Sequence, residues 1–280
     1  MRDDRITIPH LVKMKKDKRK ITMLTAYDHP LALLVDRCGI DIILVGDSLG
    51  NVVLGYDSTV PVTMEEMIHH AKAVRRAVSH AFLIGDLPFM SYNISPREAV
   101  RNAGRFLKEA GCDAVKLEGG EETVDAVSRI VKAGIPVLGH LGLTPQTISK
   151  LGGFKVQGRD AKGARKIINS ALALQEAGCF GIVLECIPDK VAGIISEKLD
   201  IFTLGIGAGP RCDGQVLVLH DLLGLYSGFK PKFVKQYADL SGDIQSAVTA
   251  FKNDIEEGRF PTKDFSFAMS DKEARKLNED

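Results

Sequence analysis

The chain has 280 residues, of which 45% are hydrophobic and 26% charged, and its 37 basic residues are balanced by 36 acidic ones. This composition is typical of a folded globular protein and argues against a fibrous or disordered chain. The near-neutral charge gives no electrostatic basis for binding nucleic acid or a membrane surface, and no apolar run approaches the roughly 20 residues that a membrane-spanning helix needs. We therefore expect neither kind of partner.

The N-terminal segment, residues 1–20, is predicted to be helical and to carry no targeting signal. It lacks the apolar core of a secretory signal, and Asp3 and Asp4 are unusual in a transit peptide. We interpret the basic run at residues 13–20 as a solvated helix end rather than a nucleic-acid patch. The five cysteines are scattered and never spaced as C-x-x-C, which argues against disulfides or a zinc site and favours the reducing cytoplasm.

Short apolar runs alternate along the chain with segments of helical composition, a pattern typical of βα units. The runs are almost continuously apolar, as expected for strands that are buried on both faces of a parallel sheet. Eight such units form either a closed barrel or an open doubly wound sheet, and we favour a single (β/α)8 TIM barrel. The predicted strands are residues 21–26, 42–45, 82–85, 114–117, 136–139, 181–184, 201–204 and 215–219.

Local signals mark where several of the predicted helices begin and end. Thr63 stands three residues before Glu66, which predicts a capping box, and Ser95 precedes a proline that suits the first helical position. Three Ala-rich helical stretches end in a glycine that can take the left-handed conformation before the next strand. These glycines are Gly111, Gly134 and Gly178.

No Pro/Ser-rich linker or change in composition divides the chain, so residues 1–280 are predicted to form one barrel domain with a C-terminal helical extension. The periodicity is lost after about Pro261, and residues 261–280 are predicted to form a charged tail. Two connections, residues 48–61 and 141–158, are longer than a minimal βα unit needs. Both follow predicted strands, at the barrel face where substrate contacts are usually found.

Acidic residues stand at the ends of four predicted strands, and these ends converge in a barrel. One such residue is typically a turn or cap residue, but four together are harder to explain in that way. Carboxylates about 5 Å apart would repel by roughly 3 kcal/mol per pair at an effective dielectric of about 20, so positive charge must offset them. Lys116 lies two residues before one of them and would share its direction on the strand. The acidic residues are Asp47, Asp86, Glu118 and Glu185.

One lysine does not balance four carboxylates, and carboxylate oxygens are the ligands that hard divalent cations prefer, so the sequence predicts a Mg²⁺ site. His140 is either a structural histidine or a substrate ligand, and its place at a strand end favours the substrate. His69 and His70 lack the i, i+4 spacing of a helical metal pair, and we expect them at the surface or at an interface. Cys186 should point away from the cavity if Glu185 points into it.

The glycine-rich run Gly205–Gly209 is not interpreted as a dinucleotide-binding loop. Pro210 stands where that fingerprint needs a third glycine, and no clear helix follows. The run either brings backbone N–H groups close to an anionic ligand or makes a tight turn before the last strand. Both interpretations stay open.

A cation with open positions, a lysine, a histidine and a spare carboxylate suit chemistry that forms a carbanion beside a carbonyl. A 2-oxo acid could chelate Mg²⁺ through its ketone and carboxylate oxygens, and the ion would then stabilise the enolate as it forms. A nearby glutamate could take the proton. Residue chemistry alone therefore indicates a reaction class and no particular substrate.

At these same residues the sequence resembles the ketopantoate hydroxymethyltransferase family. The resemblance spans about residues 20–260 in the order and spacing of the family. It is carried by the segments LTAYD (24–28), LVGDSLG (44–50), GDLPFM (85–90), VKLEGG (115–120), GHLGLTPQ (139–146), VLEC (183–186), GIGAG (205–209) and HD (220–221).

The resemblance implies transfer of a hydroxymethyl group from 5,10-methylenetetrahydrofolate to 3-methyl-2-oxobutanoate, giving 2-dehydropantoate in pantothenate biosynthesis. It also implies Mg²⁺ as the metal ion and a homodecamer of two pentameric rings. At the positions that match the family's motifs, the resemblance implies that Glu185 is the acid/base that removes the C3 proton. It implies that the metal ligands are Asp47, Asp86 and, directly or through water, Glu118. It also implies that the oxo acid is bound by Ser48, Lys116 and His140, together with Asp47 and Asp86.

Two other functions stay open. A Mg²⁺-dependent 2-oxo acid lyase or aldolase would share the barrel and the enolate, although such lyases typically carry a Lys-x-Cys-Gly-His segment that this sequence lacks. A non-catalytic barrel would keep the fold without turnover, and the complete set of candidate residues argues against it. Product formed only in the presence of methylenetetrahydrofolate would distinguish the transferase from the lyase.

Overall fold

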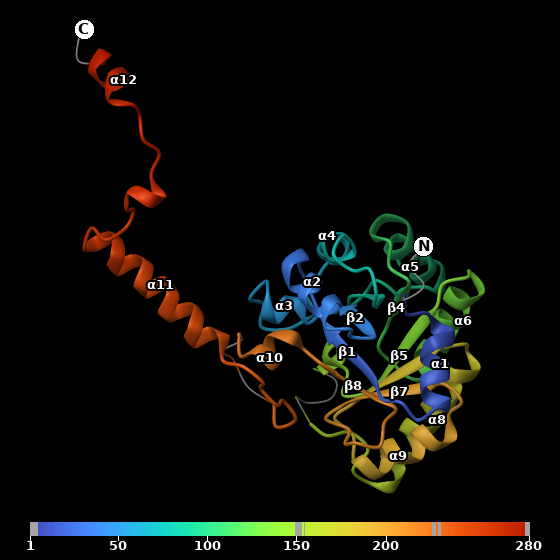
Figure 1. Ribbon diagram of the computed structural model, residues 1–280. Helices are drawn as coiled ribbons and strands as arrows, with labels where there is room; N and C mark the ends of the chain where they lie inside the picture. The colour runs from blue at the N-terminus through green and yellow to red at the C-terminus, as the bar shows by residue number, and fades with distance from the viewer. Residues whose placement is uncertain (1–4, 149–152, 154, 226–227, 229–230, 278–280) are drawn as a thin grey trace.

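A computed structural model describes residues 5–148, 153, 155–225, 228 and 231–277. Eight parallel strands close into a barrel in chain order, and β8 pairs back onto β1. Helices surround this barrel (Figure 1), which confirms the predicted (β/α)8 fold. The strands are β1 (Ile21–Thr25), β2 (Ile42–Val45), β3 (Phe82–Asp86), β4 (Ala114–Lys116), β5 (Val137–Gly142), β6 (Gly181–Glu185), β7 (Phe202–Ile206) and β8 (Gly214–Leu217).

The predicted helix signals are found in place. Thr63 and Glu66 form a reciprocal capping box at the start of α4, Ser95 caps α5, and the three predicted glycines all have positive φ. The helices are α1 (Ile8–Lys16), α2 (His29–Arg37), α3 (Leu49–Val52), α4 (Met64–Arg75), α5 (Pro96–Ala110), α6 (Val124–Lys132), α8 (Ala161–Glu176), α9 (Asp189–Lys198), α10 (Leu219–Leu223), α11 (Leu240–Glu256) and α12 (Asp271–Lys276).

Side chains alternate along the strands between the barrel interior and the surrounding helices. In β3, Phe82 and Ile84 belong to the interior apolar cluster, whereas Leu83 packs in the layer of the helices. Phe180 packs edge-on against Phe82 inside the barrel, with ring centroids 5.7 Å apart. Because the period is two, Asp86 continues the interior row at the carboxyl end of the strand. The strands thus present apolar groups in the barrel and polar groups at its mouth.

Two lysines of the basic run fasten the segment around α1 to the amino-terminal end of the barrel. Lys15 Nζ donates to Asp213 Oδ2 at 2.8 Å and to the Ser196 carbonyl at 2.9 Å. Lys20 Nζ donates to the carbonyl of Cys212. The prediction that the whole run is a solvated helix end is therefore wrong for Lys15, which is half-buried, because the tertiary fold supplies acceptors that the local sequence does not show. Lys20 is exposed, as predicted.

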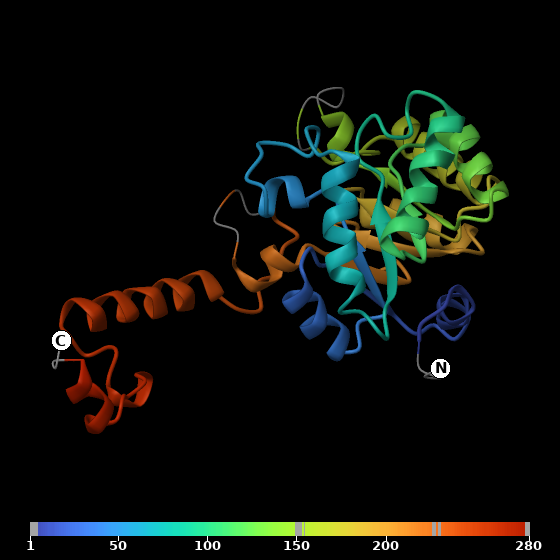
Figure 2. The same cartoon turned by 90° about the horizontal axis from the view of Figure 1, so that it is seen from above.

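After β8 the chain leaves the barrel as an arm that carries α11 and α12 (Figures 1 and 2), which confirms the predicted C-terminal helical extension. No residue of α11 is buried. One of its faces exposes Ile244, Val248, Phe251 and Ile255.

Parts of three predicted segments lie outside the described residues. They are residues 1–4 of the N-terminal segment, 149–152 and 154 of the loop 141–158, and 278–280 of the tail. Within the ranges that the structure does describe, no helix is both long and apolar enough to cross a membrane.

Candidate active site

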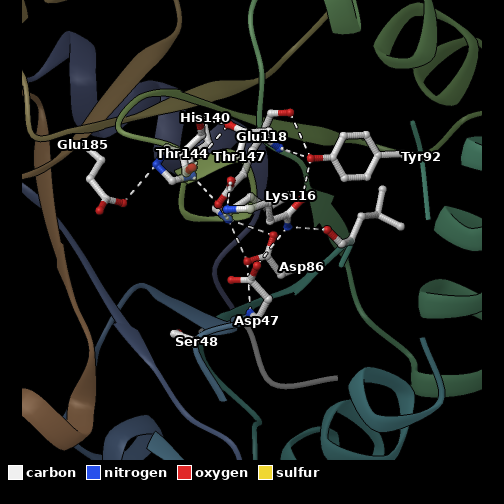
Figure 3. Close-up of polar contacts among 12 residues, drawn as sticks. Asp47, Ser48, Asp86, Tyr92, Lys116, Glu118, His140, Thr144, Thr147 and Glu185 are labelled. Atoms are coloured by element: carbon white, nitrogen blue, oxygen red, sulfur yellow. Dashed lines mark hydrogen bonds and ion pairs between the residues drawn. The ribbon is translucent and has the colours of Figure 1, made fainter. Parts of the chain in front are cut away.

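The predicted polar residues gather at the carboxyl ends of five consecutive strands, β2 to β6 (Figure 3). This arrangement follows from the closed parallel barrel, in which all strand ends of one sense meet at one face. Most of these side chains are buried, and Ser48 and Glu185 are half-buried. The residues are Asp47 and Ser48 after β2, Asp86 at the end of β3, Lys116 and Glu118 at and after the end of β4, His140 in β5 and Glu185 at the end of β6.

Lys116 is the buried cation of this cluster. Its Nζ donates to both carboxylate oxygens of Asp86, at 2.8 and 2.7 Å, and lies 3.7 Å from Glu118 Oε1. The backbone N–H of Asp47 donates to Asp86 Oδ2 at 3.2 Å. The two aspartates therefore lie next to each other, as the magnesium hypothesis requires, and Lys116 and Glu118 point into the same space.

The cluster carries more negative than positive charge in a place that excludes water. Burial, and then the charges of Asp86 and Glu118, raises the pKa of Asp47 well above its usual value. Burial also raises the pKa of Asp86, although Lys116 opposes this effect. Burial disfavours the charged form of Lys116, but the carboxylates outweigh it and raise the pKa of Lys116. A cation that binds here would relieve the repulsion among the carboxylates.

His140 bridges two glutamates (Figure 3). Its Nδ1 lies 3.3 Å from Glu118 Oε1 and its Nε2 lies 3.1 Å from Glu185 Oε2. Neither ring nitrogen has a partner in hydrogen-bond geometry, so the contacts are ion pairs when the imidazole is protonated. Burial and Lys116 act to lower the pKa of His140, but its contacts with the two glutamates outweigh them and raise it to about 9. His140 is therefore a cation at neutral pH and links Glu185 to the carboxylate cluster.

Glu185 is held in place by an unusual turn. Its carbonyl accepts from the N–H of Leu143 at 2.9 Å, and a Cβ on Gly142 would lie 2.1 Å from that carbonyl oxygen, so the close approach requires glycine. Cys186 follows with a positive φ of 48°, a conformation rare for a residue with a side chain. Burial raises the pKa of the Cys186 thiol to about 12, which keeps it protonated and unreactive.

Ser48 lies beside a buried tyrosine. Its Oγ is 2.8 Å from the hydroxyl of Tyr27, and burial raises the pKa of that tyrosine. The carbonyl of Tyr27 in turn lies 2.6 Å from Nδ1 of His70. His69 is exposed, in line with the predicted surface position, and His70 is half-buried. His70 lies in the second turn of α4 and contacts Tyr27, two residues after the end of β1, a tertiary contact that spacing does not reveal.

Two buried residues at the site were missed in the analysis of individual residues. Gln146 contacts Asp47 and Glu118, and the hydroxyl of Tyr92 contacts Gln146. Gln146 ends the segment GHLGLTPQ, which carries the family resemblance, and that was the available signal. Tyr92 gave no signal in the sequence.

The glycine run after β7 makes a tight turn. Gly207 and Gly209 have positive φ, and the chain passes directly into β8 with no helix between them. A Cβ on Gly209 would lie 2.5 Å from the Cβ of Asp189. Close packing explains this glycine, and the neighbouring carboxylate disfavours an anion there.

The donor chemistry fits a hard divalent cation, although Lys116 already engages Asp86, one of the candidate ligands. In the part of the chain that the structure describes, no three His, Cys, Asp or Glu side chains lie in ready metal-binding geometry. Lys116 accounts for this, since it engages both oxygens of Asp86. Carboxylates of Asp47, Asp86 and Glu118 still supply oxygen ligands in a buried place with excess negative charge.

Comparison with known proteins identifies the family. Residues 5–263 match the model of the family described as ketopantoate hydroxymethyltransferase. The chain belongs to this family. A relative from Moorella thermoacetica is 58% identical over 263 residues, which cover 94% of this chain and 98% of the relative. One from Syntrophomonas wolfei is 56% identical over 267 residues, 95% of this chain and 97% of the relative. Both are named 3-methyl-2-oxobutanoate hydroxymethyltransferase. The protein is therefore an enzyme of the hydroxymethyltransferase class, as the resemblance implied.

Solved structures that share the fold are much more distant in sequence. Phosphonopyruvate hydrolase has a TM-score of 0.62 at 13% identity, with 98% of this chain and 95% of that chain covered. The 2,3-dimethylmalate lyase, of the PEP mutase/isocitrate lyase superfamily, has a TM-score of 0.57 at 13% identity, covering 97% and 98%. At this identity the likeness concerns the fold alone.

Proposed function

We propose that the protein transfers a hydroxymethyl group from 5,10-methylenetetrahydrofolate to 3-methyl-2-oxobutanoate, giving 2-dehydropantoate for pantothenate synthesis. Family membership supports the reaction. The observation that carries the proposal is the convergence of one buried lysine, one histidine and four carboxylates at the mouth of the barrel, arranged so that a glutamate and a candidate cation site face the same space.

In this proposal Mg²⁺ is held by Asp47 and Asp86, with Glu118 bound directly or through water. When bound, the ion supplies an electron sink that stabilises the negative charge of the enolate. The excess of buried negative charge, seen in the raised pKa of Asp47, favours a divalent cation over a water-filled site. Lys116 and the cation would then have to share the carboxylate of Asp86, since the ammonium group of Lys116 engages both of its oxygens.

The oxo acid is bound by Ser48, Lys116 and His140. Lys116 and the protonated His140 are positive at neutral pH and suit the substrate carboxylate. The hydroxyl of Ser48 lies 2.8 Å from that of Tyr27, which fixes its direction. Burial of Lys116 and His140 keeps water from competing for their contacts.

Glu185 removes the proton from C3 of the oxo acid. Its side chain is 14% exposed, whereas the buried carboxylate of Glu118 is 1% exposed, so Glu185 is the glutamate that a substrate in the mouth can reach. His140, 3.1 Å away, holds the carboxylate of Glu185 in position. The C3 carbon of the resulting enolate forms a bond to the one-carbon unit of the folate, the C–N bonds of that unit break to release tetrahydrofolate, and water supplies the oxygen of the hydroxymethyl group.

The cation role is tested with Asp47→Asn. Removal of one anionic ligand should abolish Mg²⁺-dependent binding of 3-methyl-2-oxobutanoate, measured by calorimetry with Mg²⁺ and with chelator. Asp243→Asn, at an exposed position of α11, is the matched control and should bind as the wild type does. Equal affinity of Asp47→Asn and wild type, with and without chelator, would count against the site.

The choice between transferase and lyase is tested by the demand for folate. The wild-type enzyme should exchange the C3 hydrogen of the oxo acid with solvent without folate, but form net product only when methylenetetrahydrofolate is added. Net cleavage without folate would support the Mg²⁺-dependent lyase or aldolase. Oxo-acid binding without any exchange would support the non-catalytic barrel.

We also propose that residues 1–280 act as one domain, in which residues 261–280 form a charged tail. The protein is proposed to be cytoplasmic and to form a homo-oligomer, with the decamer as the expected form. The exposed apolar face of α11 supports association, because such a face is unusual on a monomer. A cavity of about 430 Å³ lined by residues of β1 and β8 supports it further, since the five-residue helix α10 leaves that side lightly covered. Light scattering of the wild type and of Phe251→Glu tests this proposal.

A further inference from the structure

We infer that Gln146 is a positioning residue that holds the carboxylates of Asp47 and Glu118 in the orientation that binds the divalent cation. The inference rests on the cation site proposed above. Gln146 lies after β5 in the 3₁₀ turn Pro145–Thr147 and is 3% exposed. A buried amide side chain must find hydrogen-bond partners within the protein, and the partners of Gln146 are the candidate metal ligands.

Gln146 contacts two carboxylates that come from different strands. Its side-chain Nε2 donates to Asp47 Oδ2 at 2.9 Å. Its backbone N–H donates to Glu118 Oε2 at 3.1 Å. Gln146 thus connects the carboxylate of Asp47, after β2, with the carboxylate of Glu118, after β4, across the mouth of the barrel.

The remaining contacts fix the orientation of the Gln146 amide. Nε2 also donates to the carbonyl of Leu87 at 3.0 Å, and Oε1 lies 2.7 Å from the hydroxyl of Tyr92, which donates to it. A flipped amide would place its oxygen against the oxygens of Asp47 and Leu87, so one orientation is strongly preferred. The Tyr92 hydroxyl also lies 3.0 Å from the Glu118 carbonyl, so Tyr92 contacts both Gln146 and one of the two residues that Gln146 organises.

These contacts engage one oxygen of each of the two carboxylates. Oδ2 of Asp47 and Oε2 of Glu118 accept from Gln146, so Oδ1 of Asp47 is presented to the site. Oε1 of Glu118 faces Lys116 at 3.7 Å, so Glu118 has to share this oxygen between the ion and its positive neighbours. Oε1 of Glu118 is also the atom nearest to His140, at 3.3 Å. Ligands that are oriented in advance lose less freedom on binding, and changes in such partners typically weaken metal affinity by about 10- to 100-fold.

The test replaces the amide by an apolar side chain of similar size, Gln146→Met. Binding of Mn²⁺, followed by electron paramagnetic resonance without substrate, should weaken by about 10- to 100-fold. The KM for Mg²⁺ should rise by a similar factor, whereas kcat at saturating Mg²⁺ should fall less. Gln175→Met is the matched control, since Gln175 Oε1 accepts from the N–H groups of Asp200 and Ile201, away from the site. It should leave Mn²⁺ affinity unchanged.

A second variant keeps the inference testable if Gln146→Met does not fold. Tyr92→Phe removes the hydroxyl that holds Oε1 of Gln146 and should weaken Mn²⁺ binding by a smaller factor. The double variant should lose less affinity than the product of the two single effects, because both act through one amide. Unchanged Mn²⁺ affinity in folded Gln146→Met, with only a lower melting temperature, would overturn the inference. Failure of the wild type to bind Mn²⁺ would instead overturn the proposed cation site, and the inference with it.

Discussion

The two ends of the barrel hold aspartates with similarly low solvent exposure in opposite electrostatic settings. At the amino-terminal end Asp36 is 5% exposed, and at the mouth Asp47 is 4% exposed. Asp36 accepts the backbone N–H groups of Ser79, His80 and Ala81, which outweigh the effect of burial and lower its pKa. The pKa of Asp47 is instead raised, by burial and by two neighbouring carboxylates.

Solvent exposure is similarly low at both positions, but Asp47 lies deeper in the protein, so burial and partners together account for the difference. Backbone donors stabilise the charge of Asp36 within the protein and leave it nothing further to bind. Asp47 shares one lysine with other carboxylates and so has capacity left for a cation. The amino-terminal end is built for stability and the carboxyl end for ligands, as is general in barrels of this type.

The largest effect should come from Glu185→Gln at the mouth. Loss of the base should slow exchange of the C3 hydrogen by about 10²- to 10⁴-fold, while binding of the oxo acid is retained. Exchange is followed by NMR in deuterated buffer. Glu197→Gln, an exposed position in α9, is the control. Near-normal exchange in Glu185→Gln would move the base to another residue.

Removal of one lysine from each end sharpens the comparison. Lys116→Met leaves the carboxylates at the mouth uncompensated and should lower the free energy of unfolding by about 3–5 kcal/mol without Mg²⁺. Saturating Mg²⁺ should restore part of this loss, because the ion replaces the missing charge. Lys15→Met, which loses the 2.8 Å contact with Asp213, should cost about 1–3 kcal/mol with no response to Mg²⁺. Urea unfolding measures both, and equal responses to Mg²⁺ would contradict the comparison.

Asp36→Asn should lower the free energy of unfolding by about 1–3 kcal/mol at pH 7, because one carboxylate oxygen that accepts backbone N–H groups becomes an NH₂ group. The pH dependence follows from the lowered pKa of Asp36 in the folded state. Its stabilisation is present above the unfolded pKa of about 3.9 and is lost as the pH falls through the folded value. The difference between wild type and variant should therefore be constant from pH 5 to 8 and shrink below about pH 4. A constant difference down to pH 2 would contradict this account.

The smallest effect is expected for Lys13→Ala, which breaks an exposed pair at the amino-terminal end. Lys13 lies 3.1 Å from Asp17, and the two side chains are 75% and 45% exposed. Water screens such a pair, so the free energy of unfolding should change by less than about 0.5 kcal/mol. A loss of unfolding free energy above 1 kcal/mol, measured by thermal unfolding, would show that the exposure of an ion pair at this end does not predict its contribution to stability.

Much of the fold could be predicted because its signals are local. Apolar runs and helix caps such as that of Thr63 follow from neighbours in the sequence, and the observed elements lie close to the predicted ones. The shared direction of Lys116 and Glu118 follows from the period of two along a strand. The contacts of Lys15, Lys20 and His70 were not predictable, since each partner is brought near by a distant part of the chain.

The sequence by itself determined the strand and helix pattern, the family, and which polar residues stand at the strand ends. It did not determine which of those residues form hydrogen bonds or ion pairs with one another. Only the closed barrel decided that Lys116 engages both oxygens of Asp86, and that Gln146 reaches Asp47 from 99 residues away. The physical reason is that hydrogen bonds act over about 3 Å, so they depend on the register and closure of the strands rather than on neighbours along the chain.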